Sequence, residues 1–206
     1  MSSQALVDFE ARLAEIDQLL EAHSALTKFH RAQQQLAEGS ADLADVVAAL
    51  GHLVKSPGPG RPPEVQALNK AAIALLSAHL QGYVADLFEE VVAHLFGGRV
   101  RSIDAMTSSA PTRGKPNTEN ITRLFATIGF PSILNGISWQ KMSNKSAKEK
   151  LKELNKLRND IVHGSPTTVT KPKAKNYTAF VRNFARRLDR KLRDQLQPIL
   201  GSRPWD

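Results

Sequence analysis

Apolar side chains recur at helical spacing over the first part of the chain. Residues 3–38 place one every three or four positions, starting with Leu6, Phe9, Leu13, Ile16 and Leu20. This spacing is typical of a helix with one buried face. Gly39 and Ser40 interrupt the pattern, and a second apolar stripe within residues 42–55 predicts a shorter helix that folds back on the first. We therefore expect a long N-terminal helical hairpin.

A linker rich in proline and glycine follows this hairpin. Its sequence, SPGPGRPP at residues 56–63, cannot continue a helix. Residues 64–96 then carry alanine, isoleucine, leucine and valine around most of a helical circumference, which predicts a helix at the centre of the fold. Gly97 and Gly98 end that helix. We expect two units, a hairpin or extension at residues 1–55 and a helical domain at residues 64–206.

Three further helices are predicted in the rest of the chain. Asn117 or Thr118 caps a short helix that ends near Ile128, Ser146 begins a helix that Gly164 stops, and the last helix runs over residues 175–197 before Pro198. The helix before Gly164 has an apolar face of Leu151, Leu154, Leu157, Ile161 and Val162. No pair of segments alternates as strands do. The fold class is therefore all-α, a helical bundle.

Several common chemistries lack their residues. The chain has no cysteine, so disulfides, thiol catalysis and thiolate zinc sites are excluded. No two of the six histidines lie four apart, and there is no Walker loop or GxSxG turn. Asp86 and Glu90 share a face of the central helix, but carboxylates in such positions usually pair with lysine or arginine. We expect no metal and no cofactor.

The cellular compartment is also suggested by the sequence. The first twenty residues carry acidic side chains where a secretory signal needs a basic end and an apolar run. The longest uninterrupted apolar stretch, residues 71–76, is far too short to span a membrane. We expect a cytoplasmic protein with no membrane partner.

Positive charge is concentrated in the last third of the chain. Residues 141–206 hold 17 Lys+Arg against 6 Asp+Glu, whereas the whole chain has 28 against 20. Such asymmetry favours a polyanionic partner, although a solvated basic helix face would look the same. The candidate RNA-binding residues are Lys148, Lys152, Arg182, Arg186 and Arg190.

The run RNDIVHG, residues 158–164, carries the most informative chemistry. Asn159 and His163 lie four apart and share a helical face, and the long side chain of Arg158 can reach toward them. A histidine can move protons at neutral pH, and an arginine fork can hold a phosphate. RNA supplies its own nucleophile, the 2′-hydroxyl. A histidine beside a C-capping glycine is also a common structural feature of helix ends.

This run resembles the R-x(4–6)-H signature of HEPN domains. The apolar helix AAIALLSAHLQGYVADLFEEVVAHL, then NTENITRLFATIGF, SW and the basic helix into RNDIVHG occur in the order of the RiboL-PSP-HEPN branch. The resemblance covers roughly residues 64–200. It implies a helical bundle that dimerises and a metal-independent endoribonuclease of toxin–antitoxin or antiphage systems. It also implies that Arg158 binds phosphate, Asn159 assists and His163 transfers protons.

Two departures from the family pattern accompany this resemblance. Gln81 stands on the central helix where many relatives have an acidic residue, and no tyrosine closely follows His163. Two alternatives to an RNase remain open: a non-catalytic RNA- or nucleotide-binding module, and a structural protein that docks through its N-terminal hairpin. The expected partners are RNA, a second copy of the chain in a homodimer, and an antitoxin or defence-system protein.

Overall fold

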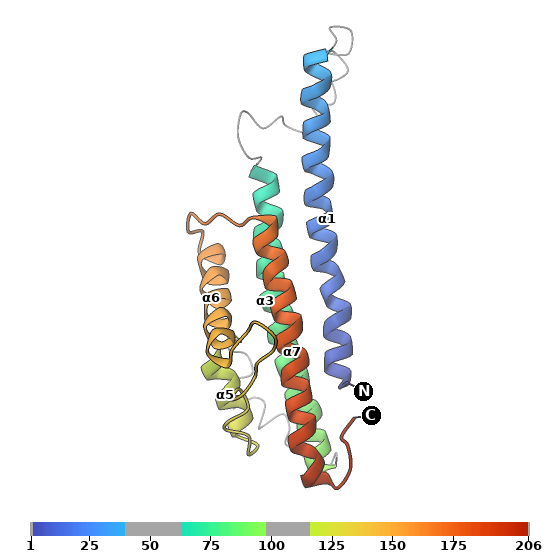
Figure 1. Cartoon of the computed structure of the whole chain (residues 1–206), viewed down its shortest axis with the longest axis vertical. Coiled ribbons are helices and arrows are strands. Elements are labelled where there is room, and N and C mark those ends of the chain that lie inside the picture. Colours follow the sequence, from blue (N-terminus) through green and yellow to red (C-terminus); the bar gives the residue numbers. More distant parts are fainter. Residues whose placement is uncertain (1, 40–62, 98–115, 206) are drawn as a thin grey trace.

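The computed structural model describes residues 2–39, 63–97 and 116–205, which form five α-helices (Figure 1). They are α1 (Gln4–Gly39), α3 (Pro63–Phe96), α5 (Thr118–Ala126), α6 (Asn144–Val162) and α7 (Lys171–Leu200). Within these ranges the only β-type pairing is an isolated bridge between Trp139 and Met142. The prediction of an all-α fold is therefore confirmed.

Helix α3 is the central element of the bundle, as its composition predicts. It packs against each of α1, α5, α6 and α7, and Figure 1 shows it running between α1 and α6. By length and hydropathy alone its segment Gln66–Phe96 could cross a membrane, but half of its most apolar window is buried within the bundle. The core position of α3 thus accounts for its apolar composition.

Helix α1 belongs to the same hydrophobic core. Its predicted stripe is buried against α3 and α7, with Phe9, Leu13 and Ile16 fully inaccessible. Polar contacts fix its position along α3: the Glu90 carboxylate accepts hydrogen bonds from the first backbone amides of α1, at 3.0 Å each. The predicted second helix of the hairpin, residues 40–55, lies outside the described residues. The division of the chain at residues 55–64 therefore stays a prediction.

The predicted start of α6 and the predicted end of α7 were both wrong, each for a local reason. Helix α6 begins at Asn144 rather than at Ser146, because the Ser143 hydroxyl accepts from the Ser146 backbone amide at 3.1 Å and so caps the helix. Helix α7 continues through Pro198 to Leu200. A proline there removes one backbone hydrogen bond in the final turn, and the helix ends at Gly201 in the left-handed conformation with φ of +72°.

Helix α7 also begins earlier than predicted. Thr170 caps it, with its hydroxyl accepting from the Lys173 amide at 3.2 Å, and Pro172 lies in the first turn, where no amide hydrogen is needed. The predicted loop after the RNDIVHG motif is therefore only about six residues long. A short connection holds the end of α6 close to the start of α7.

Candidate nucleic-acid site at the end of helix α6

The motif lies at the C-terminal end of α6 and has a well-defined backbone. His163 is the C-cap, and Gly164 follows in the left-handed conformation with φ of +73°. The amide of Gly164 donates to the carbonyl of Ile161 at 3.2 Å, and that of Ser165 donates to Asp160 at 2.8 Å. These two bonds form a Schellman motif, which satisfies the last carbonyls of the helix. Glycine is needed at this position because a side chain disfavours the positive φ.

The three motif side chains lie within two helical turns of one another. Arg158 and Asn159 are half-buried and His163 is exposed. The Arg158 guanidinium donates to the Asn159 amide oxygen, with 3.4 Å between Nη1 and Oδ1. The backbone amide of His163 donates to the Asn159 carbonyl at 2.9 Å, so the two residues are one turn apart on the same face. A cation, an amide and an imidazole thus occupy one end of one helix.

The imidazole of His163 is accessible for proton transfer. Within the described residues it has neither a side-chain hydrogen bond nor an ion pair. Likewise, Arg158 forms no ion pair with a carboxylate in that part of the chain, so its charge is not neutralised there. The two groups that the sequence analysis assigned to proton transfer and phosphate binding are therefore both free to meet a ligand.

The buried face of α6 agrees with the prediction at three positions and differs at its end. Leu151, Leu154 and Leu157 are buried, and Ile161 is half-buried. Val162 was predicted to be buried, but 53% of its surface is exposed. It lies in the last turn of α6, next to the exposed C-cap His163.

The sequence pattern did not single out Asn155, a buried asparagine on α6. Asn155 is only 6% exposed, and its side-chain amide donates to the carbonyls of Pro116 at 3.0 Å and Leu151 at 2.9 Å. The first bond ties α6 to the segment that enters α5. Such a position can be recognised in a sequence as a polar residue within an apolar stripe. A buried polar group without a hydrogen-bond partner is costly, so a partner is expected there.

The loop after the motif is held by polar side chains of α3, which the sequence analysis also missed. Val169 is fully buried, and its backbone carbonyl accepts from the Asn69 side chain at 2.9 Å. Its amide donates to the side chain of Gln66 at 3.4 Å. The central helix therefore fixes where the chain goes after His163. The sequence feature that could have indicated these contacts is the pair of amide side chains, Gln66 and Asn69, in an otherwise apolar helix.

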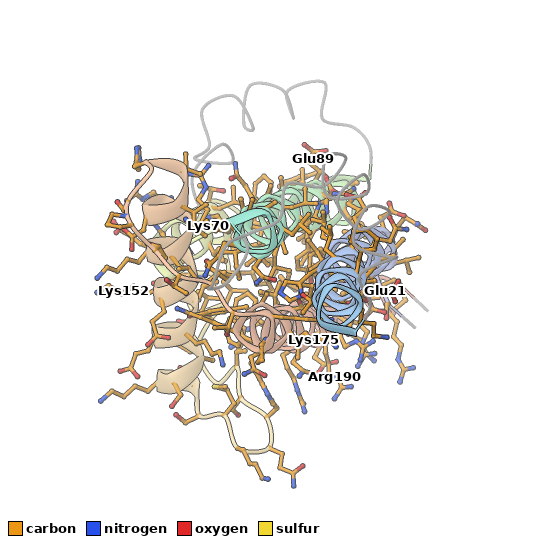
Figure 2. All side chains as sticks on the ribbon, turned by 90° about the horizontal axis from the view of Figure 1, so that it is seen from above. Glu21, Lys70, Glu89, Lys152, Lys175 and Arg190 are labelled. Carbon is orange, nitrogen blue, oxygen red and sulfur yellow. The ribbon has the colours of Figure 1, made fainter. Side chains whose placement is uncertain are left out.

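The five candidate RNA-binding residues belong to two helices, α6 and α7. Lys148 and Lys152 belong to α6, and Figure 2 shows Lys152 and Arg190 on different sides. Lys152 and Arg190 are exposed, and Lys148 donates to the Asn135 side chain at 2.9 Å. These three cations have no acidic partner among the described residues. Their role in RNA binding stays a prediction.

Arg182 and Arg186, in contrast, face acidic residues of α1. Arg182 lies 3.9 Å from Asp17, and Arg186 donates to Glu10. The hydrogen bond from Arg186 holds the pKa of the Glu10 carboxyl below its usual value. Both arginines are thus partly neutralised by the first helix, so less of their charge is available to a polyanion.

The two carboxylates of α3 singled out by the sequence have structural partners. Asp86 forms an ion pair with Arg12 at 2.9 Å, and Glu90 caps α1. The described ranges contain no group of three or more His, Asp or Glu side chains that could hold a metal ion. Gln81 on the same helix also has an interaction partner.

Comparison with known proteins connects this geometry to a family. The family model described as RiboL-PSP-HEPN matches residues 41–194. The match includes α3, α5, α6 with the motif, and most of α7, and it begins within residues that the structure does not describe. No curated protein and no solved structure matches the chain. Because the family model covers well over half of the chain, the protein belongs to the RiboL-PSP-HEPN family of the HEPN superfamily.

Proposed function

We propose that this protein is a metal-independent endoribonuclease, acting as a toxin or antiphage defence effector. Membership of the HEPN superfamily indicates an RNase or an RNA-binding module. The observation that favours cleavage is the arrangement at the end of α6. There the Arg158–Asn159 pair is in contact, and the accessible His163 lies one turn beyond it.

The reaction is an attack of the ribose 2′-hydroxyl on the adjacent phosphorus. His163 removes the 2′-hydroxyl proton as the new O–P bond forms, and the bond to the 5′-oxygen breaks. A protonated imidazole returns a proton to that leaving oxygen. The products are a 2′,3′-cyclic phosphate and a 5′-hydroxyl end. Arg158 stabilises the charge that develops on the phosphate oxygens, and Asn159 orients the arginine through the bond at 3.4 Å.

A two-fold homodimer completes this site. One chain offers a single imidazole, whereas the reaction uses both a base and an acid. A two-fold axis near the end of α6 would bring two His163 side chains into one cleft. The exposure of His163 and Val162 leaves this end of the helix free to form such a contact.

The test is incubation of purified protein with total RNA in the presence of EDTA. Wild-type protein should cleave RNA, and His163→Gln should lose about 10²–10⁴ in rate because a general acid–base group is removed. His79→Gln is a matched control, since His79 lies on α3 and pairs with Glu15 at 3.2 Å. RNA methylated at every 2′-hydroxyl should resist cleavage. A requirement for a divalent ion, or full activity in His163→Gln, would contradict the proposal.

The second candidate is a non-catalytic RNA- or nucleotide-binding scaffold of the HEPN class. It is favoured by the cations of α6 and α7 that have no acidic partner in the described part of the chain. RNA binding without any cleavage by wild-type protein would select it over the RNase.

A further inference from the structure

A pocket of about 490 Å³ lies at the opposite end of α6 from the motif. It forms between α7 and the turn that precedes α6. Polar and basic side chains line much of it, and the cations are Arg187, Arg190 and Lys191. Along α6, the N-terminal end near this pocket lies about 28 Å from His163, at about 1.5 Å of rise per residue. The pocket is therefore separate from the candidate catalytic site.

One of the pocket's cations, Lys191, is held in place by the turn that precedes α6. The Lys191 ammonium donates to the backbone carbonyls of Ser132, at 3.2 Å, and Asn135. Lys148, at the rim of the same turn, donates to the Asn135 side chain at 2.9 Å. Asn135 thus holds two ammonium groups near each other. Gly136 follows it with φ of +76°, a left-handed conformation that suits glycine.

The positive charge at this pocket is not balanced by acidic side chains. Within the described residues, Arg187, Arg190 and Lys191 form no ion pair, and the one carboxylate that lines the pocket, Asp194, pairs with Arg193. Burial lowers the pKa of Lys191, and the nearby charge of Lys148 lowers it further. This situation contrasts with Arg182 and Arg186 on the same helix, which face acids of α1. An anion in the pocket would relieve the repulsion.

We propose that this pocket binds a phosphate group of a ribonucleotide chain, as a second contact for RNA remote from the cleavage site. Three cations around one cavity suit phosphate, and arginine forks suit its tetrahedral oxygens. Gln195 also lines the pocket, and its Oε1 has no hydrogen-bond partner in the described part of the chain. The inference rests on the proposed function in taking RNA as the ligand, but it does not require cleavage.

The test measures binding in a His163→Ala background, so that the RNA probe stays intact. A labelled single-stranded RNA of twelve nucleotides is titrated at several salt concentrations. At 0.1 M salt, Arg187→Gln/Arg190→Gln should weaken binding about fivefold and lower the slope of log K against log[salt] by about 0.7, the value for one lost phosphate contact on a single strand. The matched control is Lys173→Gln/Lys175→Gln, the same charge change at exposed positions of α7. It should change the affinity less than about twofold.

A second variant distinguishes the loss of phosphate contacts from misfolding of the double variant. Ser138→Asp places a negative charge at an exposed residue that lines the pocket, and Ser138→Ala is its neutral control. Only the aspartate variant should weaken RNA binding. ATP, titrated separately, distinguishes the source of the phosphate. ATP binding that the Arg187→Gln/Arg190→Gln variant abolishes would show a free nucleotide as the ligand of this pocket.

The outcomes separate this pocket from the proposed RNase activity. Unchanged affinity for both RNA and ATP in the double and Ser138→Asp variants would overturn the phosphate site. Weakened binding in these variants supports it, even if wild-type protein cleaves no RNA. Cleavage by wild-type protein with no effect of the pocket variants on binding would leave the RNase proposal in place and remove this inference.

Discussion

The side chain of Asn69, in the central helix, donates a hydrogen bond of 2.9 Å to the backbone carbonyl of Val169, a hundred positions later in the chain. Asn69 is fully buried, as is Val169. Together with the bond from the Val169 amide to the Gln66 side chain, this contact ties the loop after the RNDIVHG motif to the core of the bundle. Helix α3 thus holds the loop that follows the motif, although α3 contributes no motif residue.

Removal of this contact should destabilise the protein. Asn69→Ala leaves the Val169 carbonyl buried without a donor, which should lower the free energy of unfolding by about 1–3 kcal/mol. Urea denaturation followed by circular dichroism measures the change. Asn176→Ala, at an exposed position of α7, is the control and should stay within about 0.5 kcal/mol of wild type. Equal stability of the two variants would show that the Asn69 bond contributes little.

Arg158 should not tolerate lysine in the proposed RNase. Arg158→Lys keeps the charge but loses the planar fork and the bond to Asn159, so the cleavage rate should fall by about a hundredfold. Arg123→Lys is the matched control, because Arg123 is exposed and its ion-pair partner among the described residues is Glu119 of its own helix, at 2.7 Å. A time course of RNA cleavage measures both. A wild-type rate in Arg158→Lys would mean that a point charge is enough at this position.

The sequence predicted the helices well because burial repeats along them. The stripes of α1 and α7 and the all-round apolar character of α3 identify the core directly. Errors arose where a cap or a proline decided the boundary, as at Ser143 and Pro198. The position of the helix boundary there depends on a single hydrogen bond, which the apolar periodicity of the sequence does not reveal.

The candidate site was only partly predictable, because its surroundings come from distant segments. The spacing within RNDIVHG places Arg158, Asn159 and His163 on one helix end without any tertiary information. The ion pair of Arg186 with Glu10 joins residues 176 positions apart, so the sequence could not show that this arginine is partly neutralised. The exposure of Val162 depends likewise on which helices reach the end of α6.

The buried carboxyl of Asp189 should make stability depend on pH. It accepts from the backbone and the hydroxyl of Ser3, and Glu90 and Trp205 lie close to it. Burial raises the pKa of Asp189, while the bonds from Ser3 oppose this. The folded state therefore binds this proton more tightly than the unfolded state does. The stability that Asp189 contributes is present below its unfolded pKa of about 3.9, and it is lost as pH rises through the raised folded pKa.

This prediction is measured as a difference between wild type and Asp189→Asn. The variant cannot ionise, so subtraction removes the other carboxyls, including Glu10 with its lowered pKa. The stability of wild type relative to Asp189→Asn should fall as pH rises from 4 to 8, measured by urea denaturation at each pH. A relative stability that rises over this range would reverse the sign and show that Asp189 is better stabilised when charged.

The two-fold dimer should depend on Val162, and the chain offers a close control for it. Val162 in α6 is 53% exposed, and Val7 in α1 is 52% exposed, so the two valines start from the same accessibility. In the proposed dimer only Val162 lies against a second copy, beside His163. Val162→Glu should then bury an unpaired carboxylate and convert the dimer to monomer in sedimentation velocity at micromolar concentration. RNA cleavage should fall with it, because each site needs both imidazoles. Val7→Glu should stay dimeric and active. A wild-type monomer that cleaves RNA would show that the site needs no second copy, and a fully active dimer of Val162→Glu would place the contact between copies elsewhere.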